Sequence, residues 1–97
     1  MSEPVHLPEV GDGGRAVLFE GEPRTVKLSL DAGERIPAHR HPERAVVIHV
    51  LSGALDLDLD EETLELAAGD VARFDGDRDI SPAAREDSVA LLVLAGR

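Results

Sequence analysis

Apolar and polar residues alternate one by one along two stretches of this 97-residue chain. In residues 26–30 the apolar positions are separated by Lys27 and Ser29, and in residues 55–59 they are separated by Asp56 and Asp58. A period of two places successive side chains on opposite faces of a β-strand. Each stretch therefore predicts a strand with one buried face and one hydrated face.

Two other stretches, residues 45–51 and 88–95, are almost continuously apolar and rich in β-branched residues, which predicts more fully buried strands. Turn signals separate the stretches at intervals of about 8–12 residues, the spacing of a sandwich or barrel. Residues 60–69 fit two structures. Asp60 could cap a short helix that ends at Gly69, whereas Leu64 and Leu66, two apart, suit a strand. The fold class that follows is all-β.

One domain accounts for the whole length. Residues 1–14 form an N-terminal leader that ends in a glycine-rich loop signal, and residues 15–97 form the predicted barrel. The leader has neither the basic start nor the apolar run of a signal peptide, and no apolar run approaches the ~20 residues of a membrane span. We therefore expect a soluble, cytoplasmic protein, with His6 solvated in the leader.

Composition narrows the function classes. Twenty acidic residues against ten basic ones give a formal net charge of −10, which argues against nucleic acid and membrane surfaces as partners. The absence of cysteine excludes disulfides, thiolate nucleophiles and cysteine-ligated metals. Lys27 is the only lysine. An acidic composition in which arginine replaces lysine is typical of proteins from halophilic or GC-rich organisms. A halophilic protein should gain stability from concentrated salt, which screens its self-repulsion.

The clearest motif is a pair of histidines two residues apart, His39 and His41, preceded by Gly33 and followed by Gly53. This pattern resembles the first motif of the cupin family, and residues 65–70 (ELAAGD) resemble the usual approach to the second. The similarity extends from about residue 24 to residue 94. It implies a small single-domain cupin of the RmlC-like superfamily, whose fold is a double-stranded β-helix, or jelly-roll, barrel.

The departures from that family pattern bear on function. In metal-binding cupins, the two histidines of the first motif are joined by a glutamate and by a histidine of the second motif. Here Val46 stands at the glutamate position and Ile80 at the histidine position. The resemblance therefore implies an incomplete ligand set and, with Ile48 and Val50, an apolar pocket lining.

The two histidines point to one face of a strand, so they could share one divalent transition metal (Zn, Ni, Cu, Fe or Mn). Glu43, in the following turn, or Asp79, beside the lost histidine, could complete such a site. His49 is a further candidate ligand, but its parity on the strand turns it to the outer face unless a bulge intervenes. Alternatively, the pair simply lines the pocket.

A second pattern, Asp75-x-Asp77-x-Asp79 followed by Glu86, imitates a calcium-binding loop. Ile80 occupies the position where such a loop requires glycine, and no flanking helices are predicted. We therefore interpret the segment as a solvated acidic loop.

Three functions are consistent with these residues. The first is a non-catalytic or vestigial module that binds or senses a small molecule. The second is a metal-dependent enzyme, dioxygenase- or isomerase-like, with its metal on His39 and His41. The third is a structural dimer module whose pocket is plugged. A homodimer is expected in any case, since a domain of this size buries limited surface and Val47, His49 and Leu51 form an outward contact row.

Overall fold

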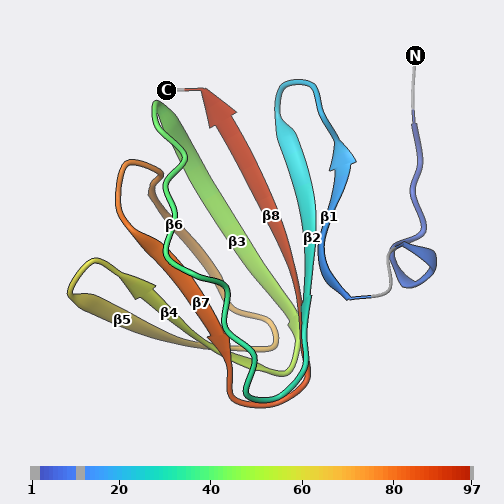
Figure 1. The fold of residues 1–97 in the computed structure, drawn as a ribbon. Coiled ribbons are helices and arrows are strands. Elements are labelled where there is room, and N and C mark those ends of the chain that lie inside the picture. Colours follow the sequence, from blue (N-terminus) through green and yellow to red (C-terminus); the bar gives the residue numbers. More distant parts are fainter. Residues whose placement is uncertain (1–2, 11–12, 97) are drawn as a thin grey trace.

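Two antiparallel sheets face one another across a shared apolar core (Figure 1). The computed structural model describes residues 3–10 and 13–96. Within them, the five-stranded sheet has the order β1 (Gly14–Phe19), β2 (Arg24–Leu30), β8 (Ser88–Gly96), β3 (Arg44–Ser52) and β6 (Val71–Asp75). The three-stranded sheet has the order β5 (Glu62–Ala67), β4 (Ala54–Leu59) and β7 (Ile80–Ala84). This architecture confirms the predicted all-β barrel.

The core follows the alternation read from the sequence. On β4, Leu55, Leu57 and Leu59 are buried, while the intervening Asp56 and Asp58 lie on the outer face. Their leucine side chains meet the inward residues of the opposite sheet, which come from β2, β3 and β8: Val26, Leu28, Leu30, Val46, Ile48, Val50, Ala90 and Leu94. The period of two thus identifies the buried face of each strand correctly.

The ambiguous segment 60–69 is a strand. β5 pairs with β4 so that Leu64 lies opposite Leu57 and Leu66 lies opposite Leu55. Asp60 adopts a left-handed conformation (φ 55°) in the tight turn between the two strands, so it closes a hairpin instead of capping a helix. The leucine spacing, not the capping signal, is therefore the better guide here.

The N-terminal segment contains one 3₁₀ turn, η1 (Leu7–Glu9), and is fastened to the barrel. The ammonium group of Lys27 donates hydrogen bonds to the carbonyl oxygens of Leu7 (2.7 Å) and Val10 (2.9 Å). Lys27 is only 8% exposed, although it lies on the outer face of the sheet. β1 begins at Gly14, one residue before the predicted start of the barrel, and His6 is exposed. No helix in the described ranges is long and apolar enough to cross a membrane.

Candidate functional site

The candidate site lies at the end of the barrel where β2 and β3 begin and β8 ends, the upper end in Figure 1. The segment between β2 and β3 reaches this end after pairing with β7. His39 exchanges backbone hydrogen bonds with Ile80 (3.1 and 2.8 Å), and the amide of His41 donates to the carbonyl of Gly76 (2.7 Å). These backbone contacts fix both histidines at the barrel mouth.

Gly76 is buried where it meets this segment. A Cβ at this position would overlap the carbonyl oxygens of His41 and Arg44, so only glycine allows the close approach. Gly76 also donates its own amide to the carbonyl of Arg44 (2.8 Å). The glycine between β6 and β7 therefore holds the start of β3 in place.

The imidazole rings of His39 and His41 pack edge to face, with centroids 4.8 Å apart and planes at 88°. His39 Nδ1 lies 3.0 Å from the carbonyl oxygen of Pro37, and the tautomer that carries a proton on Nδ1 donates there. Burial lowers the pKa of His41 to about 4, with added repulsion from His39 and from nearby arginines. His41 is therefore uncharged at neutral pH.

Within the described part of the chain, no third metal-binding side chain joins this pair. Val46 and Ile80 stand where the family pattern has a glutamate ligand and a histidine ligand. Both are core residues, with exposed fractions of 0% and 2%. Glu43 is exposed, and its amide donates to Asp77 Oδ1 (3.1 Å), whereas Asp79 Oδ1 accepts from Arg40 Nε (2.7 Å). Across residues 3–10 and 13–96, no three His, Cys, Asp or Glu side chains cluster as metal ligands. This donor set does not fit a three-ligand metal centre.

His49 lies on the outer face of the five-stranded sheet, as its strand parity predicts. It pairs with Leu91 on one side and Val71 on the other, while its neighbours Ile48 and Val50 point into the core. It is therefore separated from the histidine pair by the sheet itself.

The barrel interior is almost completely filled. Beneath the histidines remains an apolar cavity of about 20 Å³, enough for about one water molecule, whereas ligand pockets measure roughly 300–1,000 Å³. Of the four predicted lining residues, Ile48 and Ile80 border this cavity, and Val46 and Val50 are buried in the core. The interior thus offers no room for a typical ligand.

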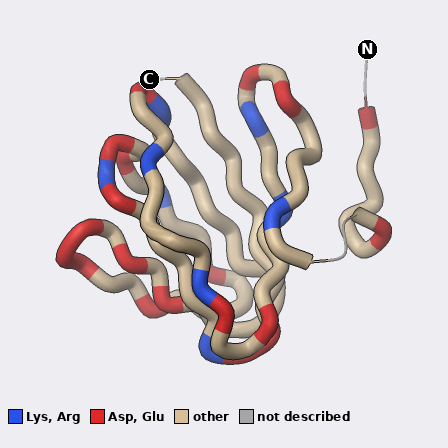
Figure 2. The backbone as a smooth tube through the Cα atoms, viewed as in Figure 1, with Lys and Arg blue, Asp and Glu red and all other residues tan. Residues whose placement is uncertain are grey.

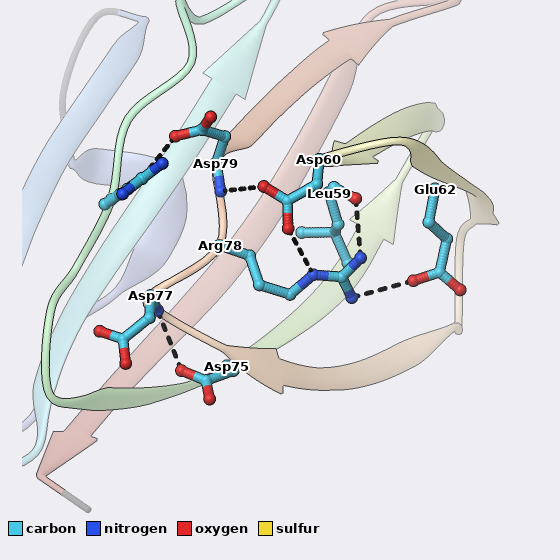
Figure 3. Close-up of polar contacts among 8 residues, drawn as sticks. Leu59, Asp60, Glu62, Asp75, Asp77, Arg78 and Asp79 are labelled. Atoms are coloured by element: carbon cyan, nitrogen blue, oxygen red, sulfur yellow. Dashed lines mark hydrogen bonds and ion pairs between the residues drawn. The ribbon is translucent and has the colours of Figure 1, made fainter.

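Of the calcium-like segment, Asp79 joins an ion-pair network, which we call the acidic loop network: Arg40, Asp60, Glu62, Arg78 and Asp79 (Figure 3). Asp75 Oδ1 accepts a hydrogen bond from the amide of Asp77 (2.9 Å). Arg78 donates to Asp60 Oδ2 (3.1 Å), Glu62 Oε1 (3.0 Å) and the carbonyl of Leu59 (2.8 Å). Asp60 Oδ1 accepts from the amide of Asp79 (3.0 Å). The carboxylates thus bind arginines and backbone amides and do not converge on a common centre.

Sequence reasoning missed one feature of the mouth. A groove of about 300 Å³, which we call the arginine groove, opens beside His41 and is lined by Arg15, Arg24, Arg40, His41, Pro42, Arg44 and Leu94. Arg24 and Arg44 each stand two residues before a buried valine, so their parity on β2 and β3 is a signal for an inward position. That signal predicts the face of each strand but not that β2 and β3 lie on either side of β8.

Solved structures with the same fold cover nearly the whole chain. An RmlC-like cupin from Desulfovibrio desulfuricans superposes with a TM-score of 0.86 at 21% identity, covering 98% of this chain and 97% of that one. An uncharacterised conserved protein with a double-stranded β-helix domain from Klebsiella pneumoniae gives 0.84 at 22% identity, covering 99% and 91%. A conserved protein of unknown function from Streptococcus pyogenes gives 0.76 at 27% identity, covering 86% and 73%.

No curated protein matches this chain. The match to a protein family is nevertheless extensive, because the cupin domain aligns with residues 26–96, from the middle of β2 to the end of β8. The spaced histidines, the facing sheets and this alignment agree, and the chain belongs to the cupin domain family.

Proposed function

We propose that this cupin is a non-catalytic module that binds or senses a small molecule at the open end of its barrel. One observation carries the proposal. Val46 and Ile80 are packed into the core at two of the four positions where metal-binding cupins have ligands, so His39 and His41 have no further metal-binding partner among the residues that the structure describes. Two neutral imidazoles alone bind a divalent metal weakly.

The volumes of the interior cavity and of the arginine groove support a ligand site at the end of the barrel and not inside it. The interior cavity of about 20 Å³ is too small for an organic molecule, whereas the adjoining arginine groove has about 300 Å³. Arg15, His41 and Leu94 line both spaces, so the groove continues down to the histidine pair. A bound molecule would therefore contact the arginines and His41.

Elemental analysis of untagged protein, purified in molar KCl without chelator, tests the proposal against the metal-dependent enzyme. We expect transition-metal content far below one ion per chain, even after incubation with Zn, Ni, Cu and Fe(II). The double variant His39→Ala/His41→Ala should then resemble the wild type. His6→Ala/His49→Ala is the matched control, because it removes the two histidines outside the site. Near-stoichiometric metal that only the first double variant loses would overturn the proposal.

Two copies of the chain are proposed to pair through the outer face of the five-stranded sheet, here called the outer apolar face: Val47, His49, Leu51, Val71, Leu91 and Val93. Leu51 and Val71 are 39% and 61% exposed. β8 has no charged residue, and Figure 2 shows it free of the acidic bands that mark the β4–β5 hairpin. Two molecules of net charge −10 therefore bring less like charge together across β8 than across the β4–β5 hairpin.

Sedimentation velocity in molar KCl tests the dimer. We expect a dimer for the wild type and a monomer for Val71→Asp, which places a charge in the outer apolar face. Val17→Asp is the control, since Val17 is also exposed but lies on the other side of the sheet. A wild type that sediments only as a monomer would exclude this pairing.

A further inference from the structure

The arginine groove concentrates positive charge on a strongly acidic molecule. Four arginines line it, and among residues 3–10 and 13–96 no acidic residue does. They come from separate parts of the chain: Arg15 from β1, Arg24 from β2, Arg40 from the following loop and Arg44 from β3. The register places Arg24 opposite Leu94 and Arg44 opposite Gly96 on β8, so both flank the last residues of that strand.

Two of the four arginines already have carboxylate partners outside the groove. Arg40 Nε donates to Asp79 Oδ1 (2.7 Å), and Arg44 Nη1 lies 3.4 Å from Glu22 Oε2. Arg15 and Arg24 have no such partner among the residues that the structure describes. Instead they repel each other: the pKa of Arg15 lies below its ordinary value because of burial and then because of Arg24. The groove thus holds two uncompensated guanidinium groups.

A second, independent observation that indicates a ligand in the groove concerns Arg24. Its Nε is buried, and in the described part of the chain it is the one buried side-chain nitrogen or oxygen without a hydrogen-bond partner. A buried donor without a partner is costly, and in a folded protein it usually indicates a missing acceptor. A guanidinium group binds a carboxylate or phosphate through two parallel N–H···O bonds, so such an oxyanion is the acceptor that its geometry suits.

From this juxtaposition we propose that the arginine groove binds a small organic anion that carries carboxylate or phosphate groups, with Arg15 and Arg24 as its principal ligands. The inference rests on the proposed binding function and names the chemical class of its ligand. The anion would accept hydrogen bonds from the free guanidinium groups, and its uncharged part would face His41 and Leu94. The volume of about 300 Å³ suits a metabolite-sized molecule and not a polymer.

Titration calorimetry of metal-free protein in low-chloride buffer at neutral pH tests the inference with two probes, citrate and inorganic phosphate. We expect saturable binding of at least one probe, which also decides between carboxylate and phosphate recognition. Triethyl citrate, which lacks the charges, should not bind. Arg24→Gln should weaken binding about tenfold or more, since it removes a charge-assisted contact. Arg15→Gln should do the same, and as an exposed edge-strand residue it is the variant more certain to fold.

Arg73→Gln is the matched control, because it removes the same charge from an exposed position on β6 outside the groove. Its affinity should equal that of the wild type. Failure of both probes to bind would overturn the anion inference, as would an equal loss in the Arg73→Gln control. Neither result bears on metal content, which is measured separately. Near-stoichiometric metal with anion binding that still depends on Arg24 would overturn the proposed function and leave this inference standing.

Discussion

Arg78 and Arg24 occupy opposite electrostatic environments in one small barrel. Arg78, in the acidic loop network, donates to three oxygen acceptors within 3.1 Å, two of them carboxylates. Arg24, in the arginine groove, has a buried Nε without any acceptor and lies near a second cation, Arg15. The same side chain thus crosslinks a loop in one region and leaves its hydrogen-bonding capacity unused in the other.

This contrast teaches that the net charge of −10 does not describe the field at the barrel mouth. Two carboxylates bind Arg78, whereas the described residues that line the groove include no carboxylate. The local distribution of charge therefore decides the sign of ligand that each region attracts. The two regions also touch. Arg40 belongs to both, and Gly76, two residues before Arg78, forms backbone hydrogen bonds with His41 and Arg44 of the groove.

Gly76→Ala should have the largest effect, since it strains the contact that joins the two regions. The added Cβ would overlap the carbonyl oxygens of His41 and Arg44 and displace the start of β3. We expect a loss of about 3 kcal/mol in the free energy of unfolding, together with weaker citrate or phosphate binding. Urea denaturation and calorimetry measure the two effects.

Gly21→Ala is the matched control, because a Cβ at Gly21 meets no atom within 4 Å. It should change neither quantity. A Gly76→Ala variant as stable as the control would show that the loop adapts easily and that Gly76 does not hold the mouth in place.

Concentrated salt should stabilise the fold but weaken anion binding in the arginine groove. Between dilute buffer and molar KCl, screening of the acidic surface should raise the melting temperature by about 10 °C, equivalent to roughly 2 kcal/mol. The same salt should weaken anion binding in the arginine groove, since screening and chloride compete for the guanidinium groups. Differential scanning fluorimetry across KCl concentrations measures the first effect. A flat melting temperature would exclude salt adaptation.

Replacement of one arginine in each region should distinguish their roles in stability and in anion binding. Arg78→Gln should destabilise the fold by about 1 kcal/mol, because it removes charge-assisted hydrogen bonds and leaves the carbonyl of Leu59 without this donor. It should not alter anion binding. Arg24→Gln should do the reverse: it should impair binding and leave the fold at least as stable, because it removes a buried donor that has no acceptor. Equal effects of the two variants on both quantities would erase the distinction between the regions.

Stability should also depend on pH, in two steps. The pKa of His41 is lowered from 6.5 to about 4, so the unfolded chain binds a proton that the folded chain does not between these values. Stability should therefore fall as the pH drops from 6.5 to 4. Hydrogen bonds from Thr63 and from the amide of Asp79 lower the pKa of Asp58 and Asp60 below 3.8. Their contribution should be lost only at still lower pH.

Urea denaturation across this pH range, with His41→Asn as the comparison, measures the two steps. The variant should lack the upper step and retain the lower one. A wild-type stability that is constant from pH 6.5 to 4 would contradict the burial of His41 beside the arginines.

The strands were predictable because alternation directly records which side chains are buried. Leu55, Leu57 and Leu59 specify their face without any knowledge of the partner strand, and the same logic places His49 outside. The arginine groove was not predictable in this way. Arg24 and Arg44 are brought together only by the pairing of β2 and β3 with β8, and local periodicity contains no information about that register. The contact between Gly76 and His41 likewise joins residues far apart in the sequence, so local periodicity does not predict it.

Lys27 has a practical consequence for chemistry at primary amines. The only lysine of the sequence is held by the carbonyl oxygens of Leu7 and Val10, beneath the N-terminal segment. Acylating reagents and enzymes that modify lysine therefore find no exposed lysine side chain while η1 stays docked. The rate at which such a reagent modifies Lys27 would accordingly report how often the N-terminal segment lifts from the sheet.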